Sequence, residues 1–295
     1  MTKQSDMAAV YSTGTMSKIV AAGGQDAFMN LGYASGVIAR ETTRVRQLRM
    51  VERVLALLAP APGERIVDVG CGKGGTLLAL RGRTAEVRCL GVNIDSLQLA
   101  TARHVAGRTA ATPLQLVQAN AAELPFRRSS CDKVYAIELL SHVARKEKFV
   151  DGVAHMLRPG GRVVLAFITL AREVQDFSPS EQENLRSVGA FFREEPESIP
   201  TFAAIAKLFE AAGFMLESHE DATDRVLPPR YEEFVSILRE IDSPWPWRRA
   251  AVAARARFQW RLRISELEPF LRANTMRHPC RDYEYHLAAW RKGAS

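Results

Sequence analysis

A glycine-rich loop is the first group of residues in this sequence that could carry chemistry. Residues 65–69 read RIVDV, a short β-branched run, and residues 70–75 continue with GCGKGG. Glycine reaches backbone conformations closed to other residues, and it leaves room for a ligand to lie against the main chain. In an open α/β sheet, the loop after the first strand approaches the ligand most closely. The pattern predicts a site for a flat, charged cofactor, although the same glycines would also serve a plain tight turn.

The loop lies within an alternation of predicted strands and helices. Short β-branched runs predict strands, and apolar residues at helical spacing predict helices. The predicted strands are residues 65–69, 87–92, 114–118, 133–137, 162–168, 214–218 and 283–290, and the predicted helices are residues 41–58, 76–80, 96–106, 148–157, 202–212 and a helical region over 231–270. This order indicates an α/β fold with a mostly parallel sheet and helices on both faces.

Two long segments lie outside this alternation. We divide the chain into an N-terminal helical lid (1–40), a cofactor-binding core (41–170), a cap segment (171–200) and a C-terminal part (201–295) that completes the sheet and carries a helical substrate-binding insertion. The cap is polar and irregular in sequence and too long for a simple connection, and we expect it to form a helical insertion. Closure of the lid and the cap over a bound substrate would exclude water from the site.

Composition and charge narrow the kinds of partner. The 295 residues are 47% hydrophobic and carry a formal net charge of +7, and much of the positive excess lies in residues 248–263. Arginines alternate there with apolar residues, as in an amphipathic helix. We therefore expect a small-molecule substrate, no nucleic-acid or membrane partner, and a cytoplasmic location. A homo-oligomer, if one forms, would use the N-terminal lid. The four scattered cysteines indicate reduced thiols and no metal site.

Four segments resemble, in order, the signatures of class I S-adenosylmethionine-dependent methyltransferases. They read VDVGCG at residues 67–72, GVNIDSLQ at 91–98, AELPF at 122–126 and LRPGGR at 157–162. The resemblance implies a Rossmann-like fold with a seven-stranded sheet, and S-adenosylmethionine as the cofactor. A NAD-dependent dehydrogenase also has a glycine loop, but it has no counterpart of the last two segments.

The resemblance also implies cofactor contacts by position. Asp68 would orient the loop and hydrogen-bond the methionine ammonium group, while Asn120 and Ala121 would lie beside the adenine. The residues implied to contact the cofactor are Tyr33, Asp68, Gly70, Cys71, Gly72, Gly74, Asn93, Ile94, Gln98, Asn120, Ala121 and Ile137.

Position 93 departs from the family pattern. The family usually has an acidic residue there that accepts both ribose hydroxyls, and this chain has Asn93. An amide can bond one hydroxyl but brings no charge. The GVNxxxxQ pattern is similar to that of sterol, cyclopropane and geranyl diphosphate C-methyltransferases, where a glutamine placed like Gln98 contacts the cofactor. Asp95 is a second candidate to replace the acid, or it caps a helix.

The candidate catalytic residues follow the fourth predicted strand or lie in the fifth. Residues 138–143 read ELLSHV and are similar to a segment of macrolide sugar O-methyltransferases, whose leader also resembles residues 29–33. This resemblance implies His142 as a general base, and Glu138 as a second base or a cofactor anchor. Alternatively, His142 begins a helix and bonds the backbone. Those enzymes have an acid after the fifth strand, whereas this chain has Phe167 and its neighbours there. The ring of Phe167 could stabilise a carbocation during alkene methylation, or it could pack in the core.

Further aromatic residues favour an apolar acceptor. The predicted pocket residues are Tyr11, Phe28, Phe191, Phe192, Tyr231 and Trp245. The sequence predicts methylation of a small, largely apolar natural product of bacterial secondary metabolism. It favours carbon, on a terpenoid, alkene or aromatic group, with cyclisation as a further outcome. The alternatives are O-methylation with His142 as the base, and a non-catalytic or repurposed cofactor-binding fold. A nucleic-acid or protein methyltransferase is disfavoured, because the sequence has no NPPY-type motif.

Overall fold

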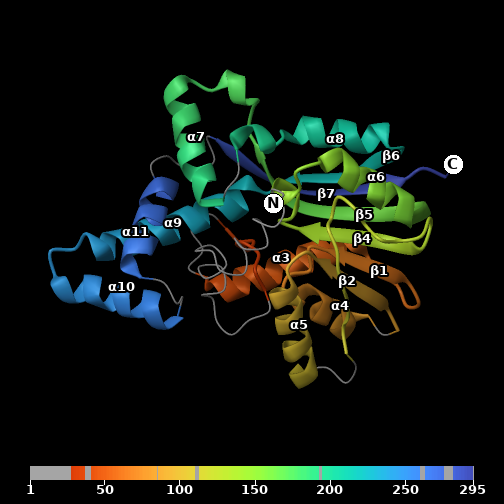
Figure 1. The fold of residues 1–295 in the computed structure, drawn as a ribbon, viewed down its shortest axis with the longest axis horizontal. Helices are drawn as coiled ribbons and strands as arrows, with labels where there is room; N and C mark the ends of the chain where they lie inside the picture. The colour runs from red at the N-terminus through yellow and green to blue at the C-terminus, as the bar shows by residue number, and fades with distance from the viewer. Residues whose placement is uncertain are drawn as a thin grey trace.

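The protein folds around one seven-stranded sheet. The computed structural model describes residues 28–36, 41–84, 86–109, 113–192, 195–259, 263–275 and 282–294 (Figure 1). The strands are β1 (Arg65–Val69), β2 (Arg88–Asn93), β3 (Gln115–Gln118), β4 (Cys131–Ile137), β5 (Leu157–Leu170), β6 (Phe214–Asp221) and β7 (Tyr283–Lys292), in the spatial order β3-β2-β1-β4-β5-β7-β6. β7 runs antiparallel to β5 and β6, and the other pairings are parallel. The predicted mostly parallel sheet is confirmed.

Helices cover both faces of the sheet (Figure 1). The helices are α3 (Thr43–Leu58), α4 (Gly75–Arg83), α5 (Ser96–Thr109), α6 (Lys146–Met156), α7 (Pro179–Phe192), α8 (Phe202–Ala211), α9 (Thr223–Ile241), α10 (Pro246–Gln259) and α11 (Ile264–Thr275), with short 3-10 turns η2 (Leu140–His142), η3 (Val174–Asp176) and η4 (Pro196–Ser198). Helices α3, α4 and α5 share one apolar cluster with one face of the sheet. Helices α6 and α8 share a second cluster with the opposite face.

The central strand β5 shows how the two faces are divided. Val164 and Ala166 belong to the cluster under α3, whereas Val163, Leu165 and Phe167 belong to the cluster under α6 and α8. This is the alternation of a strand, in which successive side chains point to opposite faces. All five side chains are almost completely buried, so β5 is covered on both sides. A side chain of β5 can therefore reach only one of the two faces.

The cap segment contains the helix expected there, although its sequence is polar and irregular. Helix α7 occupies Pro179–Phe192, so the predicted helical cap is confirmed. Its start is fixed by reciprocal hydrogen bonds: the Glu181 amide donates to Ser178 Oγ over 3.4 Å, and the Ser178 amide donates to Glu181 Oε2 over 2.7 Å. This S-x-x-E capping box is a local signal for the start of a helix, and it lies within a polar segment whose composition resembles that of a loop.

Helix α9 begins earlier than predicted and runs through two prolines. The predicted helical region starts at residue 231, whereas α9 starts at Thr223 and contains Pro228 and Pro229. Proline has no amide hydrogen, so the carbonyl one turn before Pro229, that of Arg225, loses its helical partner. The Ala34 amide replaces it, donating to Arg225 O over 2.9 Å. The helix therefore continues because the N-terminal segment 28–36 supplies the missing hydrogen bond.

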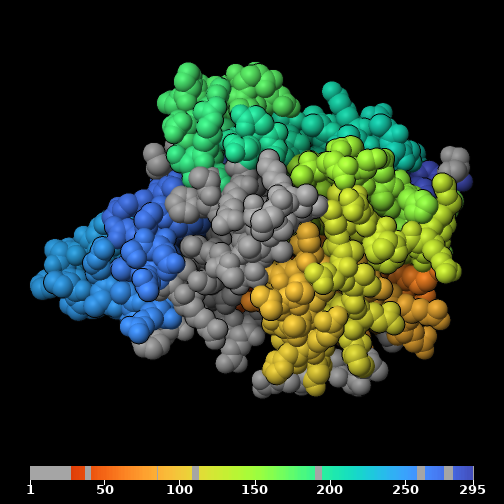
Figure 2. Space-filling view, viewed as in Figure 1, coloured from red at the N-terminus to blue at the C-terminus, as the bar shows by residue number. Residues whose placement is uncertain are grey.

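Helices α9, α10 and α11 form a separate lobe beside the sheet. They share a small apolar cluster that includes Phe234, Val252 and Phe270. Figure 2 shows this lobe extending from one end of the molecule, with α7 above it in green. None of the described helices is both long and apolar enough to cross a membrane. Cys71, Cys89 and Cys131 are buried free thiols, and Cys280 lies outside the described residues.

Candidate functional site

A cavity of about 340 Å³ lies at the carboxyl ends of the strands. Strand order reverses between β1 and β4, and ligands of open α/β sheets bind at such a reversal. The lining falls into two parts, joined by residues 138–143 after β4. We call the part lined by residues 68–73, Asn93, Gln98 and Asn120 the loop half, and the part lined by Asn184, Leu227, Arg230, Tyr231, Phe234 and Phe270 the helix half. The volume is within the range of pockets that hold small organic ligands.

The glycine loop is shaped to leave space for a ligand. Gly70 and Gly72 have φ angles of 82° and 52°, in the left-handed region that disfavours side chains. The amides of Gly70 and Cys71 both donate to the Val92 carbonyl, over 2.8 and 2.9 Å, and so fix the loop to β2. A Cβ atom at Gly72 would lie 3.4 Å from Met29 Sδ, inside the cavity lining. A side chain there would enter the space that the loop leaves open.

Asp68 places a buried carboxyl group behind this loop. Its residue is 3% exposed, and it forms no ion pair with any lysine or arginine among the described residues. Burial raises the pKa of Asp68 to about 7, and the nearby Tyr135 hydroxyl lowers it by a smaller amount. A buried carboxylate without a cation is costly. An ammonium group of a ligand would offset that cost, so the residue fits the predicted role beside the methionine end of the cofactor.

Asn93 and Gln98 are hydrogen-bonded to each other where the family binds the ribose, whereas Asp95 is hydrogen-bonded to backbone amides. Asn93 Nδ2 donates to Gln98 Oε1 over 2.9 Å, and both residues line the cavity. Asp95 Oδ1 accepts from the amides of Leu97 and Gln98 over 2.8 and 3.3 Å. That is the geometry of a helix N-cap. Of the two candidates for the missing acid, Gln98 reaches the cavity and Asp95 caps α5.

Most of the other predicted cofactor residues line the loop half, and two do not. Cys71, Ile94, Asn120, Ala121 and Ile137 all line the cavity.

Gly74 and Tyr33 are the exceptions, because neither is among the described residues that line the cavity, and their cofactor contacts stay predictions. A Cβ atom at Gly74 would lie 2.9 Å from Leu114 Cδ1 and 3.2 Å from Ala102 Cβ, so this glycine serves the packing of α5 against the loop. The Tyr33 hydroxyl donates to Glu220 Oε1 over 2.6 Å, and Arg53 lies over its ring. Both residues support the site from behind and are not among the described residues that line it.

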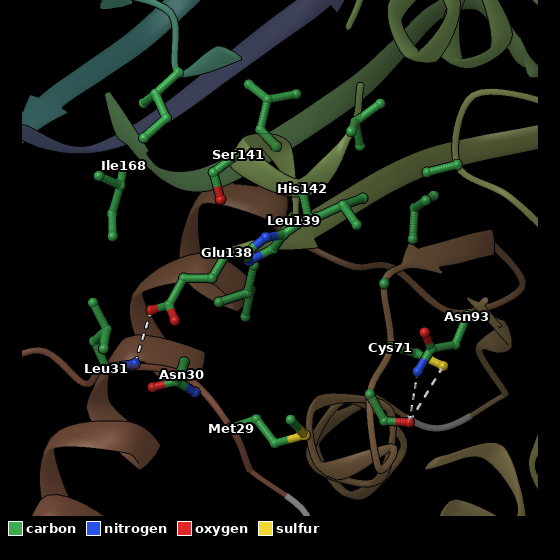
Figure 3. A pocket seen from close by; sticks show the side chains of 18 of the residues that line it. Met29, Asn30, Leu31, Cys71, Asn93, Glu138, Leu139, Ser141, His142 and Ile168 are labelled. Carbon is green, nitrogen blue, oxygen red and sulfur yellow. Dashed lines mark hydrogen bonds between the residues drawn. The ribbon is translucent and has the colours of Figure 1, made fainter. Parts of the chain in front are cut away.

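Glu138 occupies a strained position at the end of β4. Its φ angle is 55°, which is uncommon for a residue with a side chain and often marks a functional site. Its Oε1 accepts from the Leu31 amide over 2.8 Å and from the Tyr285 hydroxyl over 3.0 Å. Figure 3 shows the carboxyl group reaching across to the segment that carries Leu31. Burial raises the pKa of Glu138 to about 7, against smaller lowering effects of these two donors.

His142 lies one short turn further along the same loop. It ends η2 (Leu140–His142), and its amide donates to the Leu139 carbonyl over 2.9 Å. Its side chain lines the cavity near Glu138 (Figure 3), and its charge contributes to lowering the pKa of Glu138. The loop thus brings two titratable side chains to one wall. Across the described part of the chain, no three His, Cys, Asp or Glu side chains are grouped to hold a metal ion.

Phe167 does not reach the cavity, so its predicted catalytic role is wrong. The residue is 1% exposed, and its ring centroid lies 6.2 Å from that of Phe202 and 6.4 Å from that of Trp290, under α8. Its neighbour Ile168 lines the cavity instead. The reason is the alternation of β5, which sends adjacent side chains to opposite faces. The alternative interpretation, that Phe167 packs in the core, is confirmed.

The predicted aromatic pocket residues lie in different parts of the protein. Tyr231 lines the cavity. Phe28 packs in the core beneath Arg44, whose guanidinium carbon lies 4.3 Å from its ring centroid, and Trp245 is 61% exposed at the surface, so these two predictions are wrong. Tyr11 and the side chains of Phe191 and Phe192 lie outside the described residues.

Sequence reasoning found Tyr231 but missed the other residues that build the helix half. Leu227, Arg230, Tyr231 and Phe234 line the cavity with the spacing i, i+3, i+4 and i+7 on α9. This spacing places side chains on one face of a helix. Phe270, Ala273 and Asn274 on α11 show the same pattern. The signal was present in the sequence, but the two prolines of α9 obscured where that helix begins.

Comparisons with known proteins agree with this site. Residues 67–165 match the model of a methyltransferase domain. The O-methyltransferase cnsE of Penicillium expansum is 31% identical over 232 residues, which cover 73% of this chain and 81% of that protein.

Solved structures share the fold at low sequence identity. The cyclopropane synthase MmaA2 of Mycobacterium tuberculosis has a TM-score of 0.73 and 16% identity over 99% of both chains. A geranyl diphosphate C-methyltransferase of Streptomyces coelicolor, crystallised with S-adenosylhomocysteine, has a TM-score of 0.68 and 16% identity, covering 98% of this chain and 97% of that one. The cofactor of the present protein is S-adenosylmethionine, and the chain belongs to the class I S-adenosylmethionine-dependent methyltransferases.

Proposed function

We propose that this enzyme methylates a hydroxyl group of a small, largely apolar natural product. The observation that carries the proposal is the pair Glu138 and His142, which face the cavity between its loop half and its helix half. Bound S-adenosylmethionine supplies an activated methyl group. The protein must therefore hold the acceptor in line, keep water out, and take up the proton that the hydroxyl loses.

His142 is the base in this proposal. The neutral imidazole has a ring nitrogen that can accept a proton. Glu138 lies beside it and would stabilise the imidazolium that results, since its own carboxyl group is anchored by Leu31 and Tyr285. The raised pKa of Glu138, about 7, leaves it able to share that proton. The two residues would act as an acid–base pair at one end of the acceptor.

The apolar lining of the cavity favours an apolar acceptor. Several large apolar side chains line the helix half or other parts of the cavity: Ile168, Val188, Ile199, Leu227, Phe234 and Phe270. Such walls bind apolar surface and exclude water from the reacting atoms. The relative from Penicillium expansum is itself named an O-methyltransferase, which supports oxygen as the acceptor atom.

An assay with isotopically labelled methyl donor tests the proposal. The purified protein would be incubated with 13C-methyl S-adenosylmethionine and a panel of hydroxylated polyketide and terpenoid compounds. We expect S-adenosylhomocysteine to accumulate with some of them, and the 13C chemical shift of the product to identify a methyl ether. A C-methyl product would contradict oxygen as the acceptor. No S-adenosylhomocysteine with any compound would favour a repurposed fold.

Methylation of carbon is the second candidate, and a different set of aromatic side chains now favours it. Tyr231, Phe234, Phe270 and Tyr283 line the cavity, whereas Phe167 does not. An aromatic face can stabilise a developing carbocation. In that reaction His142 or Glu138 would accept only the final proton. The same labelling experiment separates the two candidates, because an alkyl methyl group and a methoxy group have different chemical shifts.

A further inference from the structure

Arg230 is a buried cation whose N–H donors the protein uses only in part, and its guanidinium carbon lies 5.0 Å from the ring centroid of Phe234. It lies on α9 and lines the cavity, and its side chain is 9% exposed. Its Nη1 donates to Glu233 Oε2 over 2.9 Å, whereas its Nε is fully buried and has no hydrogen-bond partner. A guanidinium group has five N–H donors. A buried donor without a partner is destabilising, so a ligand group is expected to satisfy it.

Arg230 belongs to a cluster of two guanidinium groups and one carboxylate. Glu233 also accepts from Arg46 Nη2, over 2.9 Å, so two guanidinium groups share one carboxylate. Burial raises the pKa of Glu233, but the two arginines lower it by more, and the carboxylate is therefore ionised at neutral pH. Arg46 donates a further hydrogen bond to the Pro229 carbonyl and does not line the cavity. Arg230 is therefore the cation of this cluster that lines the cavity, together with the carboxyl groups of Glu138 and Asp282. Arg230 is also one of the groups that lower the pKa of Glu138.

Asn184 contributes a complementary atom from α7. It lines the same cavity and is 7% exposed. Its Nδ2 donates to Asp282 Oδ2 over 3.5 Å, whereas its Oδ1 is buried and has no hydrogen-bond partner. An amide oxygen can only accept a hydrogen bond. The helix half thus offers a cation and a hydrogen-bond acceptor, both in walls that are otherwise mostly apolar.

We propose that Arg230 binds an acidic oxygen of the acceptor, a carboxylate or an ionised phenol, and that Asn184 accepts a hydrogen bond from a hydroxyl group of the same molecule. This inference rests on the proposed function, because it takes the helix half as the acceptor site. A guanidinium group pairs with a carboxylate through two parallel N–H donors. The acceptor is then an apolar hydroxy acid or an acidic phenol, and its charge orients it in the cavity.

Equilibrium binding of matched probes tests the inference. The full chain, loaded with S-adenosylhomocysteine, would be titrated in a calorimeter with 2-naphthoate and 2-naphthamide, and with 3-hydroxybenzoate and 3-hydroxybenzamide. We expect each acid to bind at least about tenfold more tightly than its amide, as a charged hydrogen bond of about 1.5 kcal/mol or more implies. Equal affinities, or no binding of either acid at millimolar concentration, would overturn the inference.

Two substitutions separate recognition from folding. R230Q should remove the preference for the acids, and R230K should keep part of it. R46Q is the matched control, because Arg46 pairs with the same Glu233 but does not line the cavity. It should lower the melting temperature and leave the preference unchanged. If R46Q abolishes the preference as R230Q does, the cluster has only a structural role and the inference is wrong.

The hydroxyl contact has its own control. N184L should weaken binding of 3-hydroxybenzoate several-fold and leave 2-naphthoate unchanged, because naphthoate has no hydroxyl group. An equal loss for both probes would contradict the role of Asn184. These measurements use no methyl transfer, so their failure would leave the labelling experiment on O-methylation to be judged separately.

Discussion

The loop half and the helix half of the cavity are built in different ways. The loop half comes from short segments at the carboxyl ends of parallel strands: Asp68 lies near the end of β1, Gly70 follows it, and Asn93 ends β2. Sheet topology alone brings these segments to one edge. The helix half comes from α7, α9 and α11, whose positions depend on packing between distant parts of the chain. The comparison teaches that a cofactor site can be local in sequence while the acceptor site is not.

The largest expected effect comes from a substitution in the loop half, and it tests whether the glycine loop holds the cofactor. We expect G72V to abolish S-adenosylmethionine binding, with an affinity loss of at least about a hundredfold, because the added side chain occupies the ligand space beside Met29 and Gln98. Calorimetry on the purified variant measures this directly. Unchanged affinity would mean that the glycine loop does not hold the cofactor.

A matched control separates loss of space from backbone strain. Gly63 also has a positive φ angle, of 81°, but a Cβ atom there meets nothing within 4 Å. G63V should therefore show a similar loss of stability from the left-handed backbone and normal cofactor affinity. If both variants lose the cofactor equally, strain and unfolding, rather than occupied space, explain the effect.

The two halves also differ in how far the sequence could predict them. Asp68, Gly72 and Gln98 could be placed because their roles depend on the loop and strand that contain them. Arg230 and Phe234 could not, because their function depends on how α9 packs against the sheet. Phe167 was misplaced because the alternation of β5 could point it to either face, and one residue of register decides which.

The next prediction concerns the residues between the two halves. H142A should lower turnover by roughly 10² to 10⁴, because a general base is lost, while cofactor affinity stays within about threefold. Steady-state kinetics with the acceptor found in the panel, together with calorimetry, checks both numbers. A silent H142A variant would move the base role to Glu138 or remove it. A loss of cofactor affinity would place His142 in the loop half instead.

The raised pKa of Glu138 predicts a pH dependence of the protein's stability, which can be measured. Its pKa is raised to about 7 in the folded protein, mainly by burial, from an ordinary value of 4.5. Between these two values the unfolded chain releases the proton first, so the folded protein binds more protons. Stability from this group is therefore complete below about pH 4.5 and is lost as the pH rises through 7.

The variant E138Q removes this pH dependence and can keep both hydrogen bonds, since Leu31 and Tyr285 donate to the same oxygen. Relative to wild type, E138Q should gain about 2 kcal/mol in free energy of unfolding between pH 5 and pH 8. Denaturant unfolding at the two pH values, without cofactor, measures this. A constant difference between variant and wild type would show that Glu138 titrates normally.

The smallest expected effect on turnover belongs to Phe167, and it sharpens the boundary between site and core. Phe167 packs with Phe202 and Trp290 on the face of the sheet away from the cavity. F167L should therefore lower the free energy of unfolding by about 1 kcal/mol through imperfect packing and change kcat by less than about threefold. F234L is the counterpart in the helix half, because Phe234 lines the cavity and packs edge-on against Phe270. Expressed as free energies, the increase in the acceptor KM of F234L should exceed its loss in free energy of unfolding. A large fall in kcat for F167L alone would restore a carbocation-stabilising role for Phe167, and would require β5 to present this ring to the cavity during turnover.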